Sequence, residues 1–200
     1  MNKSLQQLSK QKILSFAFLE GATVMAVELL SSKMIAPFFG TSLYTWSAVL
    51  AITLMALTGG YFLGAKLSSG VSSIIKTLAY LLSGIFIWVL IMPFLGHSLM
   101  SNLIEMDYKI AAIISAFFII VPPMVLLGSV SPLLINILGN EESPGKASGT
   151  IFTVSTLGGV IFTFVLGFFL IPEFGIRMSC IITSIFILIP LAILFSMLKN

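Results

Sequence analysis

The chain has 200 residues, of which 58% are hydrophobic and only 8% are charged. Because soluble domains carry about 25% charged residues, this composition excludes a soluble domain and predicts an all-α integral membrane protein. The formal net charge of +3 comes from basic residues at the ends of apolar stretches. That pattern sets orientation in a lipid bilayer, the expected partner of the chain, and does not indicate nucleic-acid binding.

Six membrane-spanning helices are predicted from the apolar stretches, since one span needs about 20 such residues. In chain order they cover about 13–36, 46–66, 74–95, 110–134, 149–171 and 177–197. Short loops connect them, so residues 1–200 are expected to form a single membrane domain.

Prolines predict where two of these helices are interrupted. The first helix is expected to stop at Pro37, because proline cannot donate to a continuing helix. The fourth is expected to be broken at Pro122 and Pro123 and again at Pro132. The two adjacent prolines free carbonyls one turn earlier, near 118–119, and in a membrane such groups need a donor from another helix, a hydroxyl or water.

Basic residues predict the orientation of the chain through their excess on the cytoplasmic side. With both termini in the cytoplasm, the inner side holds Lys3, Lys10, Lys12, Lys66, Lys76, Lys146 and Lys199, and the outer side holds Lys33, Lys109 and Arg177. An even number of spans agrees with this arrangement. We therefore expect a multi-pass protein whose two termini are cytoplasmic.

Two carboxylates, Glu20 and Glu28, lie within the first apolar stretch. A charge at membrane depth costs about 3 kcal/mol on insertion scales, so such a residue needs a partner, a proton or a water-filled cavity. The two are about 12 Å and about 80° apart on a helix and can face one cavity. Either they line a site for a cation or a proton relay, or each is protonated or bonded to neighbouring hydroxyls. The functional interpretation is favoured for Glu28 and balanced for Glu20, which lies nearer the inner interface.

Three further residues join the two carboxylates as candidates for substrate binding. Lys33 follows Glu28 on a different face of the helix, so it either extends outward to the interface or meets a carboxylate from another helix. Tyr44 and Trp46 are aromatic residues of the kind that lie at membrane interfaces.

Rows of small residues at spacing four predict close helix packing. One row comprises Ala56, Gly60 and Gly64, and a second comprises Ser155, Gly159, Thr163 and Gly167. Packing accounts for both rows better than a role in substrate binding does. Cys180 stands alone in the sequence, and no nucleophile–base arrangement, metal-ligand spacing or nucleotide loop accompanies it. No catalytic residue, metal or cofactor is therefore expected.

Several runs of residues resemble a known family. They are Glu20, Gly21, Met25 and Glu28; the run from Ala36 through Pro37 and Gly40 to Tyr44 and Trp46; Gly60 to Leu67; Leu127 to Leu133, which includes Pro132; Gly145 to Thr150; Ser155 to Gly159; and Leu170 to Arg177. In order and spacing, these runs resemble the membrane domain of bacterial membrane-bound spermidine synthase-like proteins. That family combines a membrane part similar to the major facilitators with an aminopropyltransferase.

The resemblance implies a bundle similar to half of a major-facilitator fold, in the inner membrane of a bacterium. The aminopropyltransferase part of the family has no counterpart in these residues, so an enzyme acting at the membrane is the least favoured interpretation. Two others stay open. The chain binds or transports a small, polyamine-like cation, as a homodimer or with a partner chain, or it anchors a separate aminopropyltransferase.

Overall fold

The computed structural model describes residues 9–70 and 74–198, and these ranges are helical apart from short turns. The elements are α1 (Lys10–Phe39), α2 (Leu43–Gly70), α3 (Ile74–Asn102), α4 (Tyr108–Leu138), α5 (Pro144–Val165), the π-helical segment η2 (Leu166–Leu170) and α6 (Ile171–Leu198). Five helical stretches in the described residues are long and apolar enough to cross a membrane. The prediction of an all-α membrane protein is confirmed at this level, and the chain is multi-pass. Lys3 and Lys199, which were used for the orientation, lie outside the described residues.

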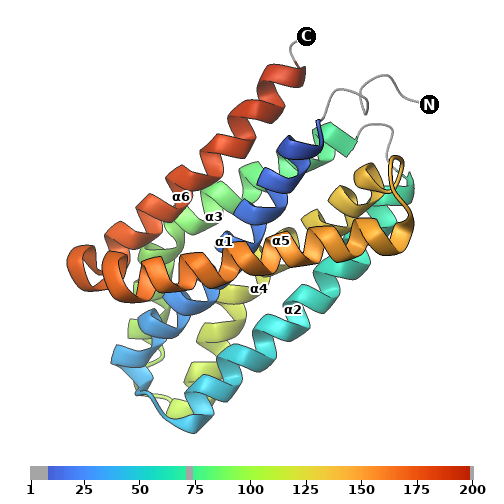
Figure 1. Ribbon diagram of the computed structural model, residues 1–200. Coiled ribbons are helices and arrows are strands. Elements are labelled where there is room, and N and C mark those ends of the chain that lie inside the picture. The colour runs from blue at the N-terminus through green and yellow to red at the C-terminus, as the bar shows by residue number, and fades with distance from the viewer. Residues whose placement is uncertain (1–8, 71–73, 199–200) are drawn as a thin grey trace.

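The last of the five stretches, Pro144–Phe195, contains a break in the helix. Gly175 has φ 72° and ψ 174°, a conformation that residues with a side chain rarely adopt. Figure 1 shows the chain reversing its direction between α5 and α6. After the reversal α6 packs mainly on α3, whereas α5 packs mainly on α1. The predicted boundaries at 171 and 177 lie on either side of Gly175, although the helical assignment continues through η2 into α6.

The expectation that the first helix stops at Pro37 is wrong. Pro37 lies inside α1, which continues to Phe39 and ends at Gly40, where φ is 78°. A proline this close to the helix end removes one hydrogen bond only, and its ring is exposed. The positive φ of Gly40 is what ends the helix, and its backbone N–H donates to Ala36 O at 2.8 Å.

The expectation that the fourth helix is broken is also wrong. Pro122, Pro123 and Pro132 all lie inside the continuous helix α4. The indole Nε1–H of Trp88 on α3 donates to the carbonyl oxygen of Ile119 at 3.1 Å. That carbonyl stands four residues before Pro123, which has no N–H to offer it. A donor from a neighbouring helix thus fills one of the positions that the prolines leave open, and the helix continues without a break.

Other helices are longer than the apolar stretches that predicted them. The second begins at Leu43, because the hydroxyl of Ser42 accepts from the backbone N–H of Thr45 at 3.3 Å. The third passes through Pro93 and ends at Asn102, and the fifth begins at Pro144 rather than near 149. Polar ends extend these helices beyond the apolar core of each span.

Two helix pairs approach closely through glycines, α2 with α4 and α1 with α5. A Cβ added to Gly60 would lie 2.6 Å from Val125 O, and one added to Gly64 would lie 2.5 Å from Ser129 O. On the other pair, a Cβ on Gly21 would overlap the carbonyl group of Ser155. Glycine is therefore required at these positions because the backbones of neighbouring helices are in direct contact.

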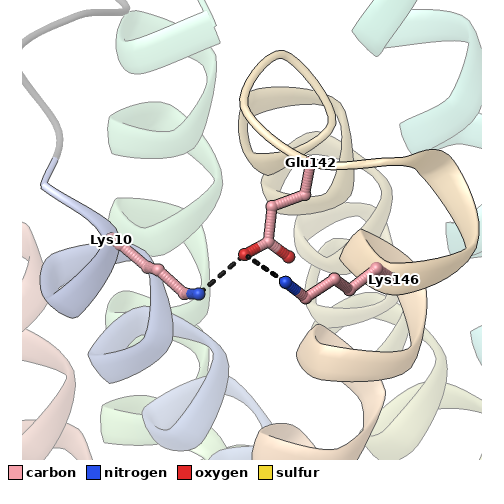
Figure 2. Close-up of polar contacts among 3 residues, drawn as sticks. All are labelled: Lys10, Glu142 and Lys146. Carbon is pink, nitrogen blue, oxygen red and sulfur yellow. Dashed lines mark hydrogen bonds and ion pairs between the residues drawn. The ribbon is translucent and has the colours of Figure 1, made fainter.

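An ion cluster joins the beginning of α1 to the turn before α5 (Figure 2). Glu142 Oε1 lies 2.6 Å from Lys10 Nζ and 3.7 Å from Lys146 Nζ. The hydrogen bond from Lys10 and the positive charges of both lysines hold the pKa of Glu142 below its usual range. Glu142 lies between two of the five apolar stretches, and Lys10 and Lys146 lie in the first turns of the stretches on α1 and α5, so the cluster joins the α1–α5 pair at its polar end.

Candidate functional site

The two close helix pairs leave a groove between them. Because α2 packs mainly on α4 and α5 packs mainly on α1, residues of all four helices line a space of about 510 Å³. We call it the α2–α5 groove. Its α1 side is formed by Glu20, Gly21, Val24 and Met25, and Gly159 from α5 lies beside them.

Glu20 is the charged residue of this lining and is only 5% exposed. The hydroxyl of Ser155 on α5 donates to Glu20 Oε2 at 2.7 Å. Ser131 on α4 also interacts with the same carboxyl. The neighbouring Gly21 explains this geometry, because its lack of a side chain lets the backbone of α5 come near enough for Ser155 to reach Glu20.

The position of Glu20 along α1 places its carboxyl at membrane depth. It lies ten residues after Lys10, about 15 Å along a helix of 30 residues. The partners of the Glu20 carboxyl are the hydroxyls of Ser155 and Ser131. A carboxylate with such partners is stable at this depth only with a proton or a visiting cation.

The remaining groove lining combines hydroxyls with aromatic rings. Tyr61 on α2 and Thr156 and Thr163 on α5 supply hydroxyls, and Phe152 and Phe164 supply rings. An ammonium group is attracted both to a carboxylate and to the face of an aromatic ring. The groove therefore offers a positively charged ligand one strong charge partner, several acceptors and apolar walls.

A second, smaller space lies on another side of Glu20. It is enclosed mainly by apolar residues of α1, α3, α4 and α6 and has room for about one water molecule. Its polar residues are Glu20 and Thr23. We call it the inner cavity, and Glu20 is the residue that lines both spaces.

Glu28, which the sequence favoured, is half-buried and lies outside the lining of the groove. Eight residues of helix turn its side chain about 80° away from that of Glu20. The structure thus places the less favoured carboxylate in the groove. Lys33 is exposed on α1, in keeping with a side chain that extends to the interface.

Tyr44 and Trp46 are exposed on the first turn of α2, 56% and 57% respectively. Lys109 Nζ lies 4.4 Å from the centre of the Tyr44 ring, and the rings of Tyr44 and Tyr108 are 6.4 Å apart. Tyr61 of the groove lies 17 residues after Tyr44 on α2, which is about 26 Å along the helix axis. These aromatic residues and the groove therefore form separate sites.

Sequence reasoning missed most of the partners of Glu20. Ser155, Gly159 and Thr163 were assigned to helix packing, and Tyr61 and Ser131 were noted only within the runs of the family resemblance. Gly159 does pack, since a Cβ there would lie 2.7 Å from Met25 Cγ, but it also lines the groove. The signal that was available is the pair of hydroxyls, Ser155 and Thr163, eight residues apart in the row of small residues on an otherwise apolar helix.

Comparisons with protein-family models, with curated proteins and with solved structures gave no match. The groove and the residues that line it are therefore the features of the molecule that indicate a function.

Proposed function

We propose that the chain is a membrane module that binds and transports a small, polyamine-like cation in the α2–α5 groove. The observation that carries the proposal is the carboxyl of Glu20, which is 5% exposed at membrane depth and bonded to a hydroxyl from α5. A bilayer disfavours such a group unless it has a function or a cationic partner. A cation that enters the groove supplies that partner.

The size and lining of the groove support this proposal. Sites for small molecules typically have volumes of about 300–1,000 Å³ and apolar walls with a few polar groups, and the groove has about 510 Å³. One end of an amine would meet Glu20, and its methylene groups would pack on Phe152 and Phe164. A polyamine combines a charged end with an apolar chain in this way.

We also propose that the chain crosses the membrane six times and has the fold of the family that its sequence resembles. The break at Gly175 divides the stretch Pro144–Phe195 into two parts, each with at least the roughly 20 residues that a span needs. Some of the residues that carry the resemblance to spermidine synthase-like membrane domains line the groove. From four separate runs, Glu20, Tyr61, Ser131 and Ser155 belong to one lining. A bundle similar to half of a major-facilitator fold is in keeping with this arrangement.

The proposed setting is the inner membrane of a bacterium, with both termini in the cytoplasm. Lys10 and Lys146 meet at one end of the α1–α5 pair, where the positive-inside rule places the cytoplasmic face. A homodimer or a partner chain would complete the transport pathway on the open side of the groove. A soluble aminopropyltransferase is the partner that the alternative function, a membrane anchor, requires.

Uptake of labelled spermidine and putrescine into proteoliposomes tests the proposal. The wild-type chain is expected to take up at least one of them, Glu20→Gln to lose uptake, and Glu28→Gln to retain it. Glu28→Gln is a matched control, because it removes the same charge from the same helix outside the groove. If the wild-type protein neither binds nor moves these cations, the proposed function fails and the anchor becomes the better account.

A further inference from the structure

The geometry points to Glu20 as an exchange point, where a bound proton is replaced by the organic cation. This inference rests on the proposed function and adds the coupling ion to it. In the empty groove Glu20 is the neutral acid. When an ammonium group binds, Glu20 gives up its proton to a water molecule in the inner cavity and becomes the carboxylate partner of the cation.

The first observation is that Glu20 lines two separate spaces. The α2–α5 groove lies between α2 and α5 and has room for an organic ligand, whereas the inner cavity lies among α1, α3, α4 and α6 and has room for about one water. A ligand in the groove and a water in the inner cavity can therefore reach the same carboxyl without competing for one space.

The second observation concerns the polar groups of the inner cavity. Its lining is otherwise apolar, with Leu78 and Leu82 from α3 and Ile187 and Leu194 from α6. A buried water needs about two to four polar partners. Glu20 and Thr23 supply them, since the hydroxyl of Thr23 donates to Leu19 O at 2.7 Å and keeps its lone pairs for the water.

The third observation is that few other groups near Glu20 can bind or release a proton. From α4 and α5 the carboxyl meets the hydroxyls of Ser131 and Ser155. Among the described residues that line the two spaces, Tyr61 on α2 is the one other titratable side chain. The other described acidic and basic groups lie outside both linings, so a proton released on cation binding is assigned to Glu20.

The exchange balances in protons and charge. The O–H bond of the Glu20 carboxyl breaks, the proton passes through the water to bulk solvent, where it is counted as released, and the ammonium group of the ligand forms a charged hydrogen bond with the carboxylate. On release of the cation, Glu20 takes a proton back. The charge at membrane depth is thus neutralised in both states, which avoids a bare carboxylate in hydrocarbon.

Calorimetric titration of the purified chain in lipid nanodiscs tests the inference, with spermidine as the ligand and buffers of different ionisation enthalpy. We expect about one proton released per bound cation and an affinity that falls as the pH is lowered, because proton and cation compete for one group. Infrared difference spectra should show the C=O band of a protonated carboxyl disappearing when spermidine binds. Glu28→Gln should keep this band change, and Glu20→Gln should lack it.

Two threonine variants test the inner cavity. The hydroxyls of Thr23 and Thr58 each donate to a carbonyl four residues earlier, at 2.7 and 2.8 Å, but Thr23 lines the inner cavity and Thr58 lies on α2 outside the lining of both spaces. In stopped-flow measurements with a pH indicator, Thr23→Val should slow proton release severalfold and Thr58→Val should leave it unchanged.

The outcomes distinguish the inference from the proposed function. If spermidine binds with no proton release and no change in the carboxyl band, the exchange is wrong and the cation site stands. If the proton is released at the same rate in both threonine variants, the proton does not leave Glu20 through the inner cavity, and that part of the inference is wrong. If wild-type protein binds no spermidine at any pH, both the proposed function and the exchange are overturned.

Discussion

Glu142 and Glu20 show two ways of holding a carboxyl on the α1–α5 pair. Glu142 lies in the turn before α5, outside the apolar stretches, and is held by Lys10 and Lys146 (Figure 2). Glu20 lies at membrane depth and is held by the hydroxyl of Ser155. Where water is near, cations of the chain itself neutralise the charge. Within the apolar stretch the partners of the carboxyl are hydroxyls, which donate hydrogen bonds but do not neutralise a charge.

The largest expected effect is on transport. Glu20→Gln should lower spermidine uptake at least tenfold, since the loss of a charged hydrogen bond at a site shielded from water costs about 2 kcal/mol or more. Glu142→Gln should leave uptake within about twofold of the wild type, because an exposed ion pair contributes little. Uptake assays in proteoliposomes at equal protein density decide this. An equal loss of spermidine uptake in Glu20→Gln and Glu142→Gln would contradict the proposal that Glu20 binds the cation and Glu142 does not.

The next effect is on stability and concerns the contact that brings Ser155 to Glu20. Gly158 faces the backbone of α1, where an added Cβ would overlap Phe18 O. Gly158→Ala should therefore destabilise the protein by about 1–3 kcal/mol. Gly167→Ala is the control, because a Cβ at Gly167 meets nothing within 4 Å. Thermal unfolding in detergent measures both, and similar melting temperatures for the two variants would contradict the close α1–α5 contact.

A smaller effect is expected for the hydroxyl itself. Ser155→Ala removes the donor to Glu20 Oε2 and should weaken spermidine binding about three- to tenfold, as the loss of about 1 kcal/mol implies. Ser148→Ala serves as the comparison, since that hydroxyl donates within its own helix to Pro144 O at 2.6 Å. Calorimetric titration provides the dissociation constants. An unchanged affinity in Ser155→Ala would mean that Ser155 does not position the carboxyl.

The smallest effect is the pH dependence of the ion cluster. The folded state holds the pKa of Glu142 below its usual value, so the cluster contributes stability above the pKa of the unfolded chain and loses it as the pH falls through the folded pKa. The difference in melting temperature between wild type and Glu142→Gln should therefore be small near neutral pH and disappear in acid. It should also shrink in high salt. A difference that grows in acid would contradict this assignment.

Composition alone predicted the class of the fold, because 58% hydrophobic residues with 8% charged leave few alternatives to membrane helices. Helix ends were predicted less well. Pro37 and Pro122 suggested interruptions, but their effects depend on neighbours that a sequence does not show, such as the donor that Trp88 provides to Ile119. The true ends depend on Gly40 and on the cap that Ser42 provides.

The site was predicted in part. Glu20 and Glu28 were both recognised as carboxylates at membrane depth, but the choice between them depends on which face of α1 meets α5. That face is set by the contacts of Gly21 with Ser155 and of Gly159 with Met25. In both contacts the two residues are more than 130 positions apart in the sequence. Glycines at spacing four indicated close packing without identifying the partner helix, so the hydroxyl partners of Glu20 could not be assigned.

A structure of the chain in lipid nanodiscs with spermidine bound tests the central claim most directly. The account predicts an amine nitrogen within hydrogen-bonding distance of the Glu20 carboxyl, with the methylene chain lying along the α2–α5 groove. A groove filled by a lipid tail, with spermidine bound elsewhere or absent at saturating concentration, would contradict it.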